Sequence, residues 1–301
     1  MSHISLGARI RLENVVLATD FSEASTAAVG YAASIARNYQ GRVYAVHVIP
    51  PELYSFQPPE TIPSIGEGVQ RLVEEQMKNL LASEQLRDVP HEGIVKHGEI
   101  WDALEPIVRH HNADVIVTGT RGRRGLRKLV MGSVAEEILR LSSVPVLTVH
   151  PEAGRTSPHV PCTILFPTDF SADSMRALAY ALSFAQEFQA CVIFLHVAPP
   201  MQNDPDVRKR VQTFFSDQLR EMVPAETRSW RQQLVVEFGD PSQAILQCTD
   251  AYKADLIVMG VQGGGAMVRA ATHFGSTAYR VISAARAPVL SVRPLHQDMS
   301  K

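Results

Sequence analysis

Cysteine is scarce in this chain of 301 residues, and its placement argues against two classes of protein. The three cysteines are Cys162, Cys191 and Cys248, an odd number without metal-ligand spacing. A small secreted domain held by disulfides needs several paired cysteines, and a structural zinc site needs closely spaced pairs. Cys191 begins an apolar, strand-like run and Cys248 lies in a helical pattern. We therefore expect small buried side chains at these two positions rather than reactive thiols.

Long hydrophobic runs and an excess of charge of one sign are also missing. No apolar run approaches the roughly 20 residues that cross a membrane, and residues 1–16 lack the apolar core of a signal peptide. The formal net charge is −2, whereas nucleic-acid-binding domains are usually basic. We expect a cytoplasmic protein that binds neither a membrane nor a nucleic acid.

Two familiar phosphate-binding motifs are absent as well. No Gly-Lys-Ser or Gly-Lys-Thr occurs, which excludes a Walker loop. The first apolar run is followed by Thr19-Asp20-Phe21-Ser22, without the glycines that a dinucleotide-binding fingerprint requires there. A nucleotide site in this chain must therefore be built differently.

The sequence contains two copies of one pattern. NVVLATDFSEAS at 14–25 matches TILFPTDFSADS at 163–174, and four more pairs of blocks follow in the same order: 42–51 with 191–200, 95–104 with 236–245, 113–119 with 254–260, and 131–151 with 274–294. Such self-similarity indicates a duplicated domain. We expect one domain at 1–150, a linker rich in Pro, Gly and Ser at 151–161, and a second domain at 162–301.

Hydrophobic periodicity predicts the fold class of each copy. In the first copy, apolar runs at 15–18, 43–49, 93–96, 114–119 and 145–149 alternate with helical patterns near 22–39, 69–87, 100–112 and 133–142. Strands without polar alternation, separated by helices, are typical of a parallel sheet covered on both faces. We expect two tandem doubly wound α/β domains, Rossmann-like, each with a five-stranded parallel sheet and a ligand site beyond the carboxyl ends of its strands.

A glycine-rich, basic segment stands where such a ligand would lie. Residues 119–133 read GTRGRRGLRKLVMGS and follow an apolar strand, and five of the eight residues at 121–128 are basic. Glycines let backbone N–H groups approach an anion, and the start of the next helix adds donors and a positive dipole end. The segment indicates phosphate binding.

These motifs together resemble the universal stress protein family. The resemblance rests on the TDFS element, the His-Val that ends the second strand, the G-x2-G-x9-G-[ST] loop and the PVLxV last strand, in two tandem copies. It implies binding of ATP, AMP or ADP, with or without Mg²⁺. By position, the aspartate matching Asp20 contacts the adenosine, Val48 meets adenine through its backbone, and the loop wraps ribose and phosphates. The implied nucleotide site comprises Ala18, Thr19, Asp20, Val48, Gly119, Thr120, Arg121, Gly122, Arg123, Arg124, Gly125, Gly132, Ser133 and Val134.

The second copy carries an altered loop. Gly263 and Gly275 enclose eleven residues instead of nine, and the basic cluster is reduced to Arg269. We expect this copy to bind nucleotide more weakly, to bind another nucleotide, or to stay empty. Its candidate residues are Pro167, Thr168, Asp169, Val197, Gly260, Gly263, Gly265, Gly275, Ser276 and Thr277.

The sequence favours a binding module over an enzyme. We identify no catalytic residues and no metal site, because Asp20 is the only acidic residue that we can place near the phosphates and phosphoryl transfer needs more. Asp20 itself could instead cap the next helix, and His47 and His196 are better explained as packed structural residues. A slow ATP hydrolase, an adenylate-type enzyme of the same fold group and a nucleotide-independent scaffold remain alternatives.

The resemblance and the repeat also suggest how the chain assembles. Family members commonly dimerise through their last strands, so 144–149 and 287–292 could pair within one chain as a pseudo-twofold internal dimer. Further homodimerisation and an unknown protein partner stay open. Eight extra residues between 52 and 90 form a candidate lid or partner surface.

Overall fold

The computed structural model describes residues 10–51, 62–120, 131–153, 160–201, 204–227, 230–261 and 276–293. The chain divides into two compact units. The N-terminal unit begins at Arg11 and the C-terminal unit at Val160, with Ile10 joined to the latter. The predicted pairing of the last strands of the two units stays a prediction.

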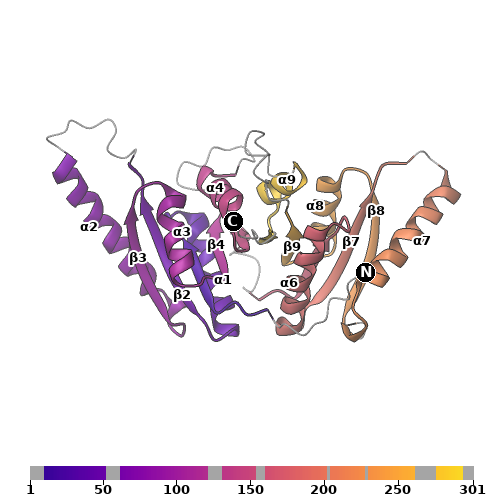
Figure 1. Ribbon diagram of the computed structural model, residues 1–301, viewed down its shortest axis with the longest axis horizontal. Coiled ribbons are helices and arrows are strands. Elements are labelled where there is room, and N and C mark those ends of the chain that lie inside the picture. Colours follow the sequence, from indigo (N-terminus) through magenta and orange to yellow (C-terminus); the bar gives the residue numbers. More distant parts are fainter. Residues whose placement is uncertain are drawn as a thin grey trace, which may run out of the picture. The chain divides into compact units, whose positions relative to one another are not determined.

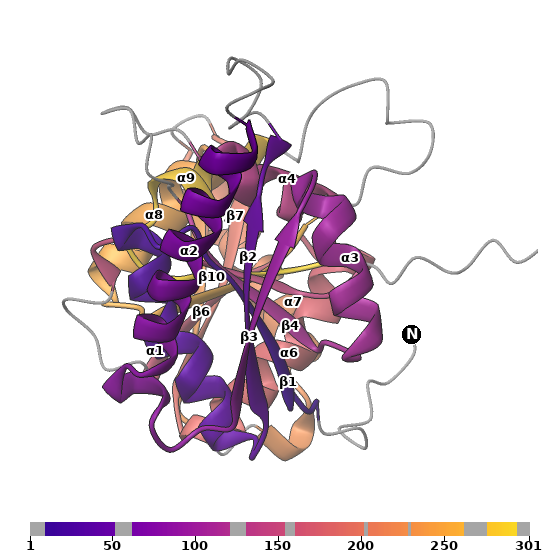
Figure 2. The same cartoon turned by 90° about the vertical axis from the view of Figure 1, so that its left-hand side faces the viewer.

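The N-terminal unit alternates strands and helices. Its elements are β1 (Asn14–Ala18), α1 (Glu23–Asn38), β2 (Arg42–Ile49), α2 (Ile62–Leu81), the 3₁₀ turn η2 (Glu84–Leu86), β3 (His91–His97), α3 (Ile100–His110), β4 (Val115–Gly119), α4 (Ser133–Leu141) and β5 (Val146–Val149). The strands lie in the order β3-β2-β1-β4-β5, and their pairs are parallel. Figure 2 shows α1 and α2 on one face of this sheet and α3 and α4 on the other.

The C-terminal unit repeats this plan. Its elements are β6 (Thr163–Pro167), α6 (Ala172–Phe188), β7 (Cys191–Ala198), α7 (Pro205–Met222), the 3₁₀ turn η3 (Ala225–Thr227), β8 (Gln232–Phe238), α8 (Pro241–Ala251), β9 (Leu256–Gly260), α9 (Ser276–Ala284) and β10 (Val289–Val292) (Figure 1). The order is β10-β9-β6-β7-β8, again with parallel pairs. The predicted pair of doubly wound α/β domains is therefore confirmed.

The core of each unit lies on both faces of its sheet. Val15, Val16 and Leu17 of β1 are fully buried, and so are Ile164, Leu165 and Phe166 of β6. A strand without polar alternation needs helices on both sides, and this requirement places β1 and β6 in the middle of their sheets. Each of these buried strands therefore holds the residues that follow its carboxyl end in a defined position.

The longest deviation from the predicted elements is α2. The helix begins at Ile62, seven residues before the predicted start, although Pro63, Gly66 and Gly68 follow. Pro63 takes the second helical position, where a backbone N–H has no acceptor within the helix, so proline is tolerated there. The apolar positions Val73 and Met77 are buried and hold the helix to the sheet.

The eight extra residues of the first copy fall between β2 and β3. Residues 50–61 connect β2 to α2, whereas only 199–204 connect β7 to α7, and the two helices differ by two residues in length. Most of the candidate lid, residues 52–61, lies outside the described residues.

Candidate functional site

The TDFS element forms a tight turn between β1 and α1. The Phe21 N–H donates to Thr19 Oγ1 at 3.0 Å, and the Ser22 N–H donates to Asp20 Oδ1 at 3.0 Å. Phe21 adopts a left-handed conformation with φ of 59°. Ser22, not Asp20, is the N-cap of α1, because its side chain accepts from the Ser25 N–H. The capping alternative for Asp20 is therefore wrong, although Asp20 stabilises the turn before the cap.

His47 and Phe21 complete this turn. His47 Nδ1 lies 2.7 Å from the carbonyl oxygen of Thr19, and its ring packs on Phe21 with centroids 4.7 Å apart. A carbonyl oxygen only accepts, so Nδ1 carries the proton and donates. His47 thus holds the end of β1 in place, as expected for a structural histidine.

The C-terminal unit reproduces the turn almost atom for atom. Phe170 has φ of 60° and donates to Thr168 Oγ1 at 3.0 Å, and His196 Nδ1 lies 2.9 Å from the carbonyl oxygen of Thr168. Burial raises the pKa of Asp169, but the hydrogen bonds from Ser171 and Ser174 outweigh it and leave that pKa below its ordinary value. Asp169 is therefore ionised at neutral pH.

The glycine that ends the fourth strand serves helix packing. A Cβ on Gly119 would lie 2.7 Å from the Ala24 carbonyl carbon and 2.8 Å from the Ser25 nitrogen, both in the first turn of α1. Gly260 has the same relation to α6, where a Cβ would lie 2.4 Å from the Asp173 carbonyl carbon. We expected close approach of an anion at Gly119. The structure shows a close approach of helix to strand there, and the approach of an anion stays a prediction.

Thr120 follows Gly119 and carries an unsatisfied hydroxyl. The residue is 3% exposed, its N–H donates to the Val149 carbonyl at 2.9 Å, and its own carbonyl accepts from the Gly132 N–H at 2.9 Å. Its Oγ1 is buried and has no hydrogen-bond partner among the residues that the structure describes. A buried hydroxyl without a partner is costly, so a polar ligand that hydrogen-bonds to Thr120 Oγ1 would stabilise this edge.

The start of α4 lies beside Thr120. Gly132 is the N-cap and contributes no side-chain cap, and Ser133 and Val134 are exposed. The first N–H groups of a helix have no intrahelical acceptor and carry the positive end of its dipole. This arrangement suits an anion.

Strand register brings three of the predicted residues to one place. Ala18 pairs with Val46 of β2 and with Thr118 of β4. Asp20, Val48 and Thr120 therefore each lie two residues beyond this register, at the carboxyl edge. Here β1 has β2 on one side and β4 on the other, so the strand order reverses, which is where ligands of doubly wound sheets bind.

Part of the predicted site cannot be placed. The described residues include Ala18, Thr19, Asp20, Val48, Gly119, Thr120, Gly132, Ser133 and Val134 of the first site, and Pro167, Thr168, Asp169, Val197, Gly260, Ser276 and Thr277 of the second, Ser276 by its backbone alone. Those outside the described residues are Arg121, Gly122, Arg123, Arg124, Gly125, Gly263, Gly265 and Gly275.

The second edge differs from the first at one buried position. Val261 stands where the N-terminal unit has Thr120, is 2% exposed, and makes the matching bond from its N–H to the Val292 carbonyl at 2.9 Å. The backbone is thus preserved while the hydroxyl is lost.

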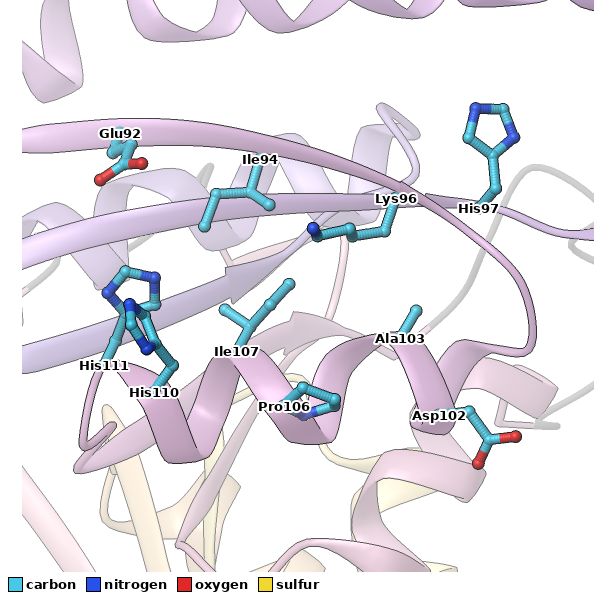
Figure 3. Close-up of a pocket in the computed structure, with 10 residues that line it drawn as sticks. All are labelled: Glu92, Ile94, Lys96, His97, Asp102, Ala103, Pro106, Ile107, His110 and His111. Atoms are coloured by element: carbon cyan, nitrogen blue, oxygen red, sulfur yellow. The ribbon is translucent and has the colours of Figure 1, made fainter.

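Sequence reasoning missed a groove of about 730 Å³ between β3 and α3. Figure 3 shows Ile94 and Lys96 directed from β3 toward Ile107 and Ala103 of α3, with His110 and His111 together at one end. Burial, His110 and Arg42 lower the pKa of His111, against a smaller opposite effect of Glu92. The signal was the alternation Glu-x-Ile-x-Lys at 92–96, which differs from Gln-x-Val-x-Glu at 233–237.

Metal-binding clusters and membrane-spanning helices are both absent from the described residues. No group of three or more His, Cys, Asp or Glu side chains in the ranges given above could hold a metal ion. Among the same residues, no helix combines the length and apolar character needed to cross a membrane.

Comparison with known proteins identifies the family. A model of the universal stress protein family matches residues 11–150 and 163–293. The chain belongs to the universal stress protein family. It is a tandem member, since both units match.

Universal stress proteins of one and two domains are among its relatives. A universal stress protein of Methanocaldococcus jannaschii is 30% identical over 148 residues, which cover 46% of this chain and 81% of that protein. One from Mycolicibacterium smegmatis is 25% identical over 297 residues, covering 93% and 97%. The crystal structure of a universal stress protein from Archaeoglobus fulgidus covers 94% of this chain and 98% of its own, with a TM-score of 0.68 and 23% identity. This last likeness shows the shared fold.

Proposed function

We propose that the N-terminal unit binds an adenine nucleotide, ATP first and ADP or AMP as alternatives, at the carboxyl edge of β1 and β4. The observation that carries the proposal is the buried, unpartnered Oγ1 of Thr120 at the point where the strand order reverses. A hydroxyl there both donates and accepts, so a ribose hydroxyl or a phosphate oxygen would satisfy it.

In this proposal, different residues around Thr120 contact the base, the ribose and the phosphates. Asp20 accepts hydrogen bonds from a ribose hydroxyl or the adenine amine, and the Val48 backbone meets the base. The start of α4, with Ser133, receives phosphate oxygens. The basic run at 121–128 offsets the phosphate charge, and any Mg²⁺ is held mainly by the phosphates because Asp20 is the single acidic residue of the proposed site.

The same residues favour a regulatory binding module over a fast enzyme. His47 is engaged by Thr19, and Asp20 is the single acidic residue of the predicted site. Rapid hydrolysis would need a group that orients water and a metal-binding set. We infer that nucleotide occupancy, not turnover, is the signal that a stress-response partner would read.

The C-terminal unit is the weaker site in this proposal. Its turn and Asp169 are intact, but Val261 offers no hydroxyl and the basic cluster is gone. Nucleotide bound there and not in the N-terminal unit would reverse the ranking.

The first test identifies what the purified protein carries. Heat denaturation of freshly purified chain should release an adenine nucleotide, measured by chromatography and mass spectrometry. Protein that releases none and shows no ATP binding by calorimetry would contradict the proposal. Rapid multiple turnover of labelled ATP would contradict the binding-module reading alone.

The second test uses the difference between the two units. Thr120→Val copies the residue of the C-terminal unit and should weaken ATP binding about twofold to tenfold, the value of one hydrogen bond. Ser83→Ala removes another buried, unpartnered hydroxyl from the same unit, near η2, and serves as the control. Equal affinities for parent and Thr120→Val would remove the support that Thr120 gives.

A further inference from the structure

Strand β3 is an edge strand whose outer side is open. It ends the strand order with β2 as its neighbour, and within the described residues no strand pairs with its other side. Figure 2 shows β3 with α2 on one side and α3 on the other. An edge strand offers main-chain donors and acceptors to another strand.

The hydrogen bonds to β2 show which residues of β3 have groups at this edge. The Val43 N–H donates to the Pro90 carbonyl at 2.9 Å, and the Gly98 N–H donates to the Ile49 carbonyl at 3.1 Å. In a parallel pair, alternate residues direct both N–H and C=O to the same neighbour. The even-numbered residues of β3 therefore bond to β2, and the odd-numbered residues 91–97 direct their main-chain groups outward.

The side chains on the groove face form a self-complementary pattern. Gly93 faces α2, because a Cβ on it would lie 2.8 Å from Met77 Cγ, so Glu92, Ile94 and Lys96 face the other way and line the groove. Ile94 stands midway between an acidic and a basic residue at equal spacing. Rotation by 180° about Ile94 exchanges the two charges.

We propose that β3 is a homodimer interface, in which the β3 strands of two copies pair antiparallel about Ile94. This register places Glu92 opposite Lys96 of the partner twice and Ile94 opposite Ile94. These are the non-hydrogen-bonded positions, where side chains approach most closely. The odd-numbered residues supply the main-chain bonds, and the interface closes on itself because each copy presents the same patch.

The groove beside β3 offers apolar surface that a second copy would cover. Its lining includes the apolar residues Ile94, Ala103, Pro106 and Ile107, and Figure 3 shows Glu92 and Asp102 toward opposite ends with Lys96 between them. A second copy brings the matching Ile94 and its flanking charges to this strip, so that apolar surface and charge are complemented together.

The corresponding edge of the C-terminal unit lacks the pattern. Rotation about Val235 of β8 would place Gln233 opposite Glu237, which offers no ion pair. The interface is therefore assigned to β3 alone.

Charge reversal on the full-length chain tests the pairing. Sedimentation velocity and light scattering should show a dimer for the parent chain. Glu92→Lys and Lys96→Glu each replace two attractive pairs by two repulsive ones, so each should weaken the dimer about tenfold or more. A mixture of the two variants should recover a heterodimer, because each then supplies the charge that the other lacks.

A matched variant and a fold control complete the experiment. Glu237→Lys makes the same kind of reversal on β8 and should leave assembly unchanged, and circular dichroism checks that each variant is folded. The proposal is overturned if the parent chain is monomeric at every concentration, if both single variants dimerise as the parent does, or if the mixture fails to recover the dimer. The dimer experiment needs no nucleotide, so its outcome does not depend on whether the proposed nucleotide site exists.

Discussion

Replacing Gly119 with alanine should destabilise the N-terminal unit in the absence of any ligand. The added Cβ would lie 2.7–2.8 Å from Ala24 and Ser25, and most of these contacts are with backbone atoms that cannot rotate away. The first turn of α1 must therefore move, and it carries the Ser22 cap and the turn containing Asp20. Overpacking of this kind costs about 1–3 kcal/mol.

The unfolding temperature measures this cost. For a unit of roughly 150 residues, each kcal/mol lowers the midpoint by about 2–4 °C, so the expected drop is about 2–12 °C. Differential scanning calorimetry on nucleotide-free protein gives the value. Gly66→Ala is the control, since a Cβ at this helical glycine meets nothing within 4 Å and alanine should stabilise α2 by up to about 1 kcal/mol.

The outcome distinguishes the two explanations for Gly119. If the midpoint is unchanged while ATP affinity falls, the glycine serves the ligand, and the packing argument is refuted. If the midpoint falls, the glycine is explained by the contact between strand and helix. Gly260→Ala should then destabilise the C-terminal unit through the Asp173 backbone.

Two further predictions concern titratable groups. Burial, with a smaller effect of Glu237, raises the pKa of the Cys248 thiol to about 11. Iodoacetamide at pH 8 should therefore label the exposed Cys162 first and Cys248 only after unfolding. Early labelling of Cys248, detected by mass spectrometry, would contradict this. The pKa of Asp169 is lower in the folded protein than its ordinary value of 3.8, so the ionised carboxylate stabilises the fold at pH values above 3.8. This stabilisation is lost as the pH falls through the pKa of the folded state. Asp169→Asn should therefore be less stable than the parent at pH 7 in urea unfolding, with a difference that shrinks toward pH 3; a constant difference would exclude the carboxylate as its cause.

Much of the fold was predictable because its signals are local. Uninterrupted apolar runs gave the strands, 3.6-residue spacing gave the helices, and the duplication applied both twice. The start of α2 was misplaced because Pro63 and the glycines after it suggest a loop locally, whereas burial of Val73 and Met77 favours the helix. Cys191 is only partly buried, since it begins β7 at the end of the sheet, while Cys248 is buried as expected.

The candidate site was predictable in position more than in detail. Motifs after successive strands must meet at one edge, so Asp20, Val48 and Thr120 could be brought together from the sequence. The contact of Gly119 with α1 and the lack of a partner for Thr120 Oγ1 depend on three-dimensional packing. The groove beside β3 was missed because it depends on where α3 packs. The alternation Glu-x-Ile-x-Lys at 92–96 indicates the wall formed by β3 but not the position of α3 opposite it.

The strand order also dictates when the site can exist during synthesis. β1 is made first, but its neighbour β4 begins about 100 residues later, at Val115. Until β4 emerges and inserts, one side of the buried strand β1 has no partner, and an exposed apolar edge invites association with other chains. A nascent chain that ends before β4 therefore contains Asp20 and Val48 but only part of the candidate site, so a ligand of the complete site would stabilise the unit only after its most exposed stage has passed.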